Sequence, residues 1–150
     1  MKAIWKQLYT EDGILIYEGY TLHDKAYGEG TVYYPDGKIY QQGIFDIKGL
    51  IKGKEYYPNG QLRFEGTLRI NKGYGPNYPT QGCCYDSNGN LLKSGDFSVR
   101  RTGVGYPIVE KPEGYGTIPQ EKRPSFPVLM WGDLDEEERK DYFNDDTRRD

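Results

Sequence analysis

The sequence feature that most constrains the fold is a set of four Asx-Gly pairs, each of which predicts a tight turn between two β-strands. The turn glycines follow one another at spacings of 24, 23 and 29 residues. Six residues after each of them stands a second glycine, and two residues after each stands an aliphatic residue. The turn glycines are Gly13, Gly37, Gly60 and Gly89. Fixed offsets that recur four times indicate an array of repeated β-hairpins.

The stretch from Tyr17 to Gly37 is the most regular unit of this array. It opens with Tyr-Glu-Gly, continues through Tyr-Gly-Glu-Gly-Thr and closes with Tyr-Tyr-Pro-Asp-Gly. We expect residues 17–22 to pair with residues 27–34, and the Pro-Asp-Gly turn to start the next strand. Alternation would place the second, fourth and sixth residues after each turn glycine on one face of the strand. A glycine at the sixth position would then leave a slot for a ring from a neighbouring strand.

The composition fits a thin sheet better than a thick core. Hydrophobic residues make up 35% of the 150 residues, whereas an ordinary globular domain is closer to about half apolar. Yet 15% of the residues are aromatic, with fifteen tyrosines, and twenty residues are glycines. Such a chain is too aromatic to be disordered. Tyrosine rings can cover one sheet while their hydroxyl groups stay in water.

The motifs of residues 17–37 resemble a MORN repeat, and the looser units from Gly43 to Gly60 and from Gly66 to Gly89 resemble the variant MORN-type repeats of small bacterial proteins. The resemblance covers roughly residues 5–105. It implies a mostly β fold, an elongated single-layer antiparallel sheet of consecutive β-hairpins in which each repeat contacts mainly its neighbours. It also implies a module for protein interaction or membrane apposition, with any catalytic domain on a separate segment.

A proline-rich segment follows the repeats. Five of the nine prolines lie between Pro107 and Pro127, and this density excludes central strands and predicts either a linker or a strap that lies back across the sheet. The apolar run from Phe126 to Trp131 favours the strap, because a free linker would leave it exposed.

The last segment is acidic. Asp133 resembles an N-cap, with Glu136 three residues later, and this pattern predicts a short α-helix from about Leu134 to Phe143. We therefore expect a repeat sheet over residues 1–110, a Pro-rich strap or linker over 111–130, and an acidic helix and tail over 131–150.

The charge distribution argues against general nucleic-acid binding and against membrane adhesion. The net charge is −3, and residues 131–150 hold nine acids and four bases, which leaves +2 for the first 130 residues. Neither part supplies the basic field that displaces counterions from phosphates or binds anionic lipid. We expect no direct nucleic-acid binding, and a membrane surface is the least favoured partner.

The residues predict neither a catalytic nor a metal site. The neighbours Cys83 and Cys84 would point to opposite faces of a strand, so we expect free thiols, and one histidine adds no zinc spacing. No nucleophile motif, phosphate-binding loop or dinucleotide fingerprint occurs, and His23 is expected to be a turn residue and not a base. We therefore expect no enzymatic activity and no cofactor. Reduced thiols, together with the lack of a signal-peptide core or membrane span, favour the cytoplasm.

Candidate partner contacts lie where the repeat pattern fails. The stretch from Asn71 to Gly82 is about six residues longer than the first two units allow, and such an insertion is either a loop on the binding side or an inert excursion. The expected contacts are tyrosines in irregular Gly/Pro contexts, the tryptophan that ends the apolar run, and the acids of the helix start. They are Tyr74, Tyr78, Tyr106, Tyr115, Trp131, Asp135, Glu136, Glu137 and Glu138.

Three binding functions remain open from the sequence. We prefer a non-enzymatic protein-interaction module, because rigid amphipathic rings are enriched at interfaces. The second is a small inhibitor, an immunity or anti-defence protein whose acidic tail mimics nucleic acid towards a toxin or nuclease. The third is apposition to a phospholipid membrane. A homodimer through a sheet edge or through the strap is a further expectation.

Overall fold

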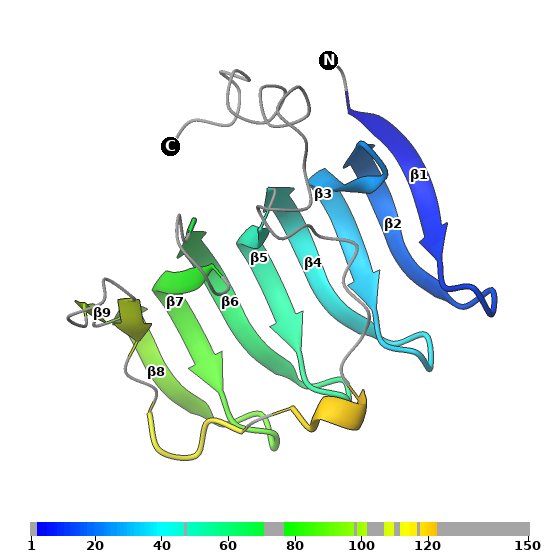
Figure 1. The fold of residues 1–150 in the computed structure, drawn as a ribbon. Coiled ribbons are helices and arrows are strands. Elements are labelled where there is room, and N and C mark those ends of the chain that lie inside the picture. Colours follow the sequence, from blue (N-terminus) through cyan, green and yellow to red (C-terminus); the bar gives the residue numbers. More distant parts are fainter. Residues whose placement is uncertain are drawn as a thin grey trace.

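The chain forms one eight-stranded antiparallel sheet, in which each strand pairs with the strands before and after it in sequence (Figure 1). The computed structural model describes residues 3–46, 48–70, 77–97, 99–101, 107–109, 112–116 and 118–122. The strands are β1 (Ile4–Tyr9), β2 (Leu15–Leu22), β3 (Lys25–Tyr33), β4 (Ile39–Asp46), β5 (Gly49–Tyr56), β6 (Leu62–Arg69), β7 (Tyr78–Tyr85) and β8 (Leu91–Asp96). The mostly β, single-layer fold of consecutive hairpins is confirmed.

Shorter elements follow the large sheet. Strands β9 (Val99–Arg101) and β10 (Pro107–Val109) form a separate antiparallel pair, and η1 (Gln120–Lys122) is a single 3-10 turn. No α-helix occurs among the described residues, and the helix expected near residues 134–143 lies outside them. Within the described ranges no helix is long and apolar enough to cross a membrane.

All four Asx-Gly turns close in the same way. In the turn before β2, the Thr10 amide donates to the Ile14 carbonyl at 2.9 Å and the Gly13 amide donates to the Thr10 carbonyl at 2.9 Å. The corresponding pairs of bonds recur in the turns that end at Lys38, Gln61 and Asn90. The repeated turn chemistry therefore produces a repeated turn structure.

A β-bulge follows each turn and changes the predicted assignment of faces. In β2, Tyr17 is opposite Leu8 and Leu15 is opposite Tyr9, so Ile16 is an extra residue. Because the two residues of a bulge oppose one partner residue, the third and fourth residues after the turn glycine turn to the same face. The second residue after the turn glycine then lies on the other face of the sheet. The prediction that this residue shares a face with the fourth residue after the turn glycine is wrong. The extra residues of the four bulges are Ile16, Tyr40, Arg63 and Leu92.

A row of seven directly paired glycines crosses the sheet from β2 to β8. A Cβ built on Gly53 would fall on the Gln42 carbonyl oxygen and lie 2.8 Å from the Cα of Gly43. Only at Gly30 does a ring, that of Tyr17, fill the space. Gly30 is not one of the glycines six residues after a turn, and at Gly43 and Gly66, where the ring slot was predicted, the prediction is wrong. At most other positions the facing backbone fills the space. The row consists of Gly19, Gly30, Gly43, Gly53, Gly66, Gly82 and Gly95.

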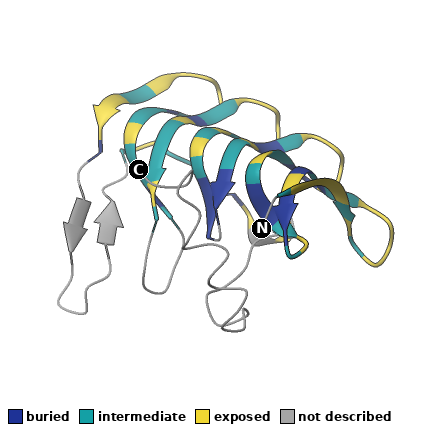
Figure 2. Cartoon of the chain, turned by 90° about the horizontal axis from the view of Figure 1, so that it is seen from above, coloured by how far each residue is buried: buried dark blue, intermediate teal, exposed yellow. Residues whose placement is uncertain are grey.

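The core lies on one face of the sheet, here called the inner face. Its central row has one side chain from each strand, in the order Leu8, Tyr17, Val32, Gln41, Glu55, Phe64, Cys84 and Lys93. Figure 2 shows buried residues mainly in the middle of the sheet, whereas the edge strands β1 and β8 are largely exposed. Cys84 is fully buried in this row and Cys83 is half-buried on the other face, so the prediction that the two thiols point apart is confirmed.

The described part of the proline-rich segment packs on this inner face. Ile118 is buried in the main core cluster with Tyr17, Val32 and Phe45, and Tyr115 packs against Phe64 and its neighbours. Figure 1 shows residues 112–116 and 118–122 near the turn ends of the strands. In these residues the segment is a strap across the sheet. The division at residues 110 and 130 stays a prediction.

The glycine row predicts different costs for the same substitution at two glycines. Both Gly53 and Gly60 have positive φ, +146° and +92°, but nothing lies within 4 Å of a Cβ added to Gly60. We expect Gly60→Ala to lower the free energy of unfolding by about 1 kcal/mol, the cost of a side chain in that conformation. Gly53→Ala should cost about 3 kcal/mol or more, because its methyl group also collides with facing backbone. Urea unfolding measures both, and equal losses would contradict the close approach at the row.

Candidate protein-interaction surface

The two tyrosines of each Tyr-Tyr-Pro motif point to opposite faces of the sheet. Tyr34 and Tyr57 are buried on the inner face, and their hydroxyl groups donate to the carbonyls of Tyr56 and Tyr85, each at 2.6 Å. Burial raises the pKa of both phenols. Each acceptor belongs to the following repeat, so the inner tyrosine bonds one hairpin to the next. Tyr33, like Tyr56, is half-buried and lies on the outer face.

The outer face carries a tyrosine–aliphatic row at the turn end of the sheet. In each of the four turn-linked hairpins, a tyrosine at the end of one strand is directly opposite the aliphatic residue at the start of the next strand. Directly opposed residues share a face and contact each other. The pairs are Tyr9–Leu15, Tyr33–Ile39, Tyr56–Leu62 and Tyr85–Leu91.

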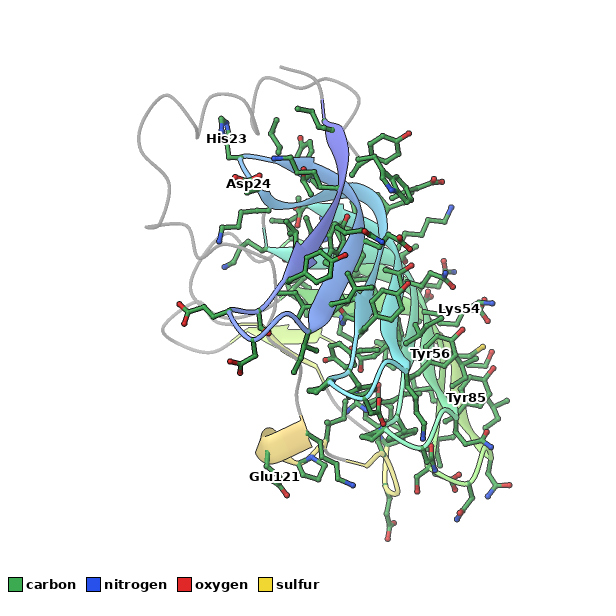
Figure 3. All side chains as sticks on the ribbon, turned by 90° about the vertical axis from the view of Figure 1, so that its right-hand side faces the viewer. His23, Asp24, Lys54, Tyr56, Tyr85 and Glu121 are labelled. Atoms are coloured by element: carbon green, nitrogen blue, oxygen red, sulfur yellow. The ribbon has the colours of Figure 1, made fainter. Side chains whose placement is uncertain are left out.

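This row is partly accessible along its whole length. Its two end members are the most exposed, with Tyr9 at 52% and Leu91 at 57%, and the six residues between them are half-buried. With strands about 4.8 Å apart, neighbouring pairs lie about 9.6 Å from each other and the row is roughly 33 Å long. Figure 3 shows Tyr56 and Tyr85 on the side of the sheet opposite Glu121 of η1.

A polar row lies beside the tyrosine–aliphatic row on the outer face. Its members bond in pairs across the strands: the side-chain amide of Gln7 donates to the Glu18 carboxylate at 2.7 Å, and Lys54 and Glu65 form an ion pair at 3.7 Å. Two carboxylates and one ammonium group give the row a net charge of −1. In strand order the row is Gln7, Glu18, Thr31, Gln42, Lys54, Glu65, Cys83 and Ser94.

The inner face contains a half-buried ion pair that holds the strap. Arg63, the extra residue of its bulge, pairs with Glu55. Its guanidinium also donates to the Gly116 carbonyl at 2.9 and 3.3 Å and to the Tyr115 hydroxyl at 3.0 Å. The Tyr115 ring lies 4.1 Å from the guanidinium carbon, within cation–π range. Burial opposes the charge on Arg63, but attraction to Glu55 outweighs it, and the pKa of Arg63 is raised.

Two of the partner contacts predicted from the sequence lie in the described residues, and both contact the protein itself. Tyr78 is buried at the start of β7 opposite Arg69, and Tyr115 is half-buried against Arg63. The structure brings none of the nine together on one surface that it describes, and their role as partner contacts stays a prediction. The other seven lie outside the described residues: Tyr74, Tyr106, Trp131, Asp135, Glu136, Glu137 and Glu138.

The tyrosine–aliphatic row was missed from the sequence, although its signal is present. The tyrosines of the strands, Tyr33 and Tyr56 among them, were interpreted only as rings that cover the sheet. Adjacent residues of a strand point to opposite faces, so each Tyr-Tyr pair must place one ring outside. The aliphatic partners were assigned to the same face as the fourth residue after each turn glycine, because the bulges were not foreseen.

The described residues contain no cluster of side chains suited to metal binding. No group of three or more His, Cys, Asp or Glu side chains in them could hold a metal ion. His23 and Asp24 form the turn between β2 and β3, as expected for His23, and lie at the hairpin tip in Figure 3. A hydrogen bond from Lys6 lowers the pKa of Asp24.

Comparison with known proteins identifies the repeats. Residues 26–46 and 51–69 match the family model described as the MORN repeat variant. These segments cover most of the hairpins β3–β4 and β5–β6, so the predicted MORN-type repeats are confirmed there. MORN repeats are generally modules for protein or membrane interaction and are typically non-enzymatic. No curated protein and no solved structure matches the chain.

Because Tyr56 and Tyr57 point to opposite faces, removing their hydroxyl groups should lower the free energy of unfolding by unequal amounts. The Tyr57 hydroxyl donates to the Tyr85 carbonyl at 2.6 Å and accepts from the Gly116 amide at 3.2 Å. Tyr57→Phe removes both hydrogen bonds. We expect a loss of about 2 kcal/mol in the free energy of unfolding. Tyr56→Phe, on the outer face, should change it by less than about 0.5 kcal/mol. Chemical denaturation compares the two, and a larger loss for Tyr56→Phe would reverse the assignment of faces.

The parallel N–H donors of the Arg63 guanidinium predict that a lysine cannot replace this arginine. Arg63→Lys keeps a cation near Glu55 but cannot donate in parallel to the Gly116 carbonyl. We expect the Gly116 amide, which donates to the Tyr57 hydroxyl, to exchange its hydrogen about tenfold faster or more. Amides of β3 and β4 serve as the internal control. Unchanged exchange at Gly116 would show that Arg63 does not hold the strap.

Proposed function

We propose that this protein is a non-enzymatic protein-interaction module, and that the outer face of the sheet is its docking surface. The observation that carries the proposal is the tyrosine–aliphatic row, four cross-strand pairs that lie side by side on the face opposite the core clusters of the described residues. Tyrosine offers a large rigid contact area with few torsions to immobilise, together with a hydroxyl group for hydrogen bonding. These properties suit a surface that must be stable in water and also bind a protein.

The geometry of the row supports an elongated partner. It is one residue row wide and runs perpendicular to the strands for roughly 33 Å. A helix laid along it would need about 22 residues. Since the pairs recur about every 9.6 Å, a partner with apolar side chains at that interval would contact each repeat in the same way. The polar row beside it offers hydrogen-bonding groups to the rim of such an interface.

The charge of the outer face favours a protein over a membrane. Attraction to an anionic membrane grows by about 1 kcal/mol for each basic residue near the lipid. The polar row has one lysine, Lys54, against the carboxylates of Glu18 and Glu65, and Lys54 is paired with Glu65. The inhibitor alternative depends on residues 131–150, which lie outside the described residues, and the described sheet adds no observation in its favour.

A photo-crosslinker at Tyr56 tests the proposal. With a photoreactive phenylalanine analogue there, we expect irradiation in the source cell to give a discrete crosslinked protein species. The same group at Glu121, which lies on the opposite side of the sheet (Figure 3), should not give that species. In the Tyr56 crosslinking background, Tyr33→Ser should reduce the yield about tenfold, the effect of losing one interfacial ring.

The controls separate docking from folding. Glu121→Ala alters an exposed residue on the opposite side of the sheet (Figure 3), and it should leave both the Tyr56 crosslink and the circular dichroism spectrum unchanged. The same crosslinked species obtained in equal yield with the photo-crosslinker at Tyr56 and at Glu121 would contradict docking on the outer face. Flotation of the full chain with anionic vesicles, without a protein crosslink from Tyr56, would instead indicate membrane apposition.

A further inference from the structure

Strand β1 is a free edge of the sheet within the part of the chain that the structure describes. It pairs only with β2, and five of its six residues are exposed. Ile4, Trp5 and Tyr9 are among the most exposed large hydrophobic residues of the described protein. An edge strand presents unpaired backbone groups, and most proteins protect such an edge.

The backbone groups that face outward from β1 can be identified from the turn. The Thr10 amide donates to Ile14 across the β1–β2 hairpin, so the backbone of Thr10 points towards β2. In antiparallel strands the backbone groups of alternate residues point to opposite sides. Leu8 and Lys6 therefore point towards β2, and the N–H and C=O groups of Trp5, Gln7 and Tyr9 point away from the sheet.

The usual protections of an edge strand are absent from β1. It has no proline, and the bulge in its hairpin is on β2, at Ile16. Its one charged side chain, Lys6, is bound to Asp24 of the β2–β3 turn. Nothing in this strand opposes the addition of another strand.

We propose that two copies of the protein associate by antiparallel pairing of their β1 strands, with Gln7 of one copy opposite Gln7 of the other. Paired residues must lie on the same face of the joined sheet, and all three outward-facing residues can form backbone bonds only in this register. It places Trp5 opposite Tyr9 of the second copy. A register centred on Lys6 would place the Lys6 side chains of the two copies opposite each other, a like-charge pair that destabilises a sheet. It would also pair fewer backbone groups.

The side chains of the outer face fit this register. Trp5 already contacts Tyr20 edge-to-face, with ring centroids 5.3 Å apart. In the dimer the opposite edge of Trp5 lies beside Tyr9 of the second copy, so the tyrosine–aliphatic row of each copy continues into the Trp5–Tyr20 pair of the other. The interface is the same on both subunits, and it closes after two copies. The inference goes beyond the proposed function and does not depend on it, because Tyr56 lies on β5, away from this edge.

Substitution by proline at two neighbouring positions tests the edge. The full-length wild-type protein should sediment as a dimer. Gln7→Pro removes a backbone amide that faces away from β2 in each copy. We expect the affinity of the dimer to fall about a hundredfold while the circular dichroism spectrum is retained. Leu8→Pro removes an amide that faces β2, and it should instead loosen the β1–β2 hairpin, as seen in faster hydrogen exchange at Tyr17.

Cysteine crosslinking tests the register in a Cys83→Ser background. Paired Cα atoms in a sheet lie within the range that a disulfide spans, whereas residues offset by two positions do not. Oxidation should therefore link two copies of Gln7→Cys and not two copies of Lys6→Cys. The proposal is overturned by a disulfide in Lys6→Cys alone, by open polymers that join β1 to β8, or by a monomer. A monomer whose Gln7 amide is protected from exchange would show that the protein covers this edge with its own chain.

Discussion

The close approach of the strands along the glycine row is the constraint on which the rest of the structure depends. At Gly43, Gly53, Gly66 and Gly82 the space that a side chain would need is occupied by the backbone of the facing strand. The inner face is therefore bare backbone along this line, and its side chains gather on either side. Glycine positions and bulges are the features that curve a sheet, and the strands bend visibly in Figure 1. A single layer can thereby wrap partly around its own core, and both of its faces remain available for different tasks.

Tyrosine makes this thin architecture stable because one residue type serves both faces. On the inner face the rings of Tyr34 and Tyr57 are buried and their hydroxyl groups satisfy carbonyls of the next repeat. On the outer face Tyr33 and Tyr56 cover aliphatic partners and stay in contact with water. The stability of one repeat thus depends on its neighbour, as in other repeat arrays. The same alternation that builds the core produces the outer row, so the proposed docking surface is a by-product of folding and needs no dedicated loop.

The array was predictable from the sequence because its turns have a specific chemistry, but the bulges were not. The extra residues Ile16, Tyr40, Arg63 and Leu92 share no chemical property, so nothing in their side chains marks them. Without the bulge, alternation assigns the aliphatic residue after each turn to the wrong face, and the outer row cannot be recognised. The irregular context of Tyr115 was interpreted as a contact for a partner, whereas in the structure its ring packs on Arg63. Its contact with Arg63, 52 residues away, depends on tertiary structure that no local pattern contains.

The identity of the bulge residue determines what each repeat attaches to the inner face. Where it is Ile16 or Leu92, the side chain packs on an apolar cluster. Where it is Arg63, the bulge directs a guanidinium inward, and its desolvation is offset by Glu55 and by the strap. A strap rich in glycine and proline has few apolar side chains, so a charged donor to its backbone carbonyl is an effective anchor. The strap covers the inner face at this point, and the proposed contacts with other protein chains accordingly lie on the outer face and at the β1 edge.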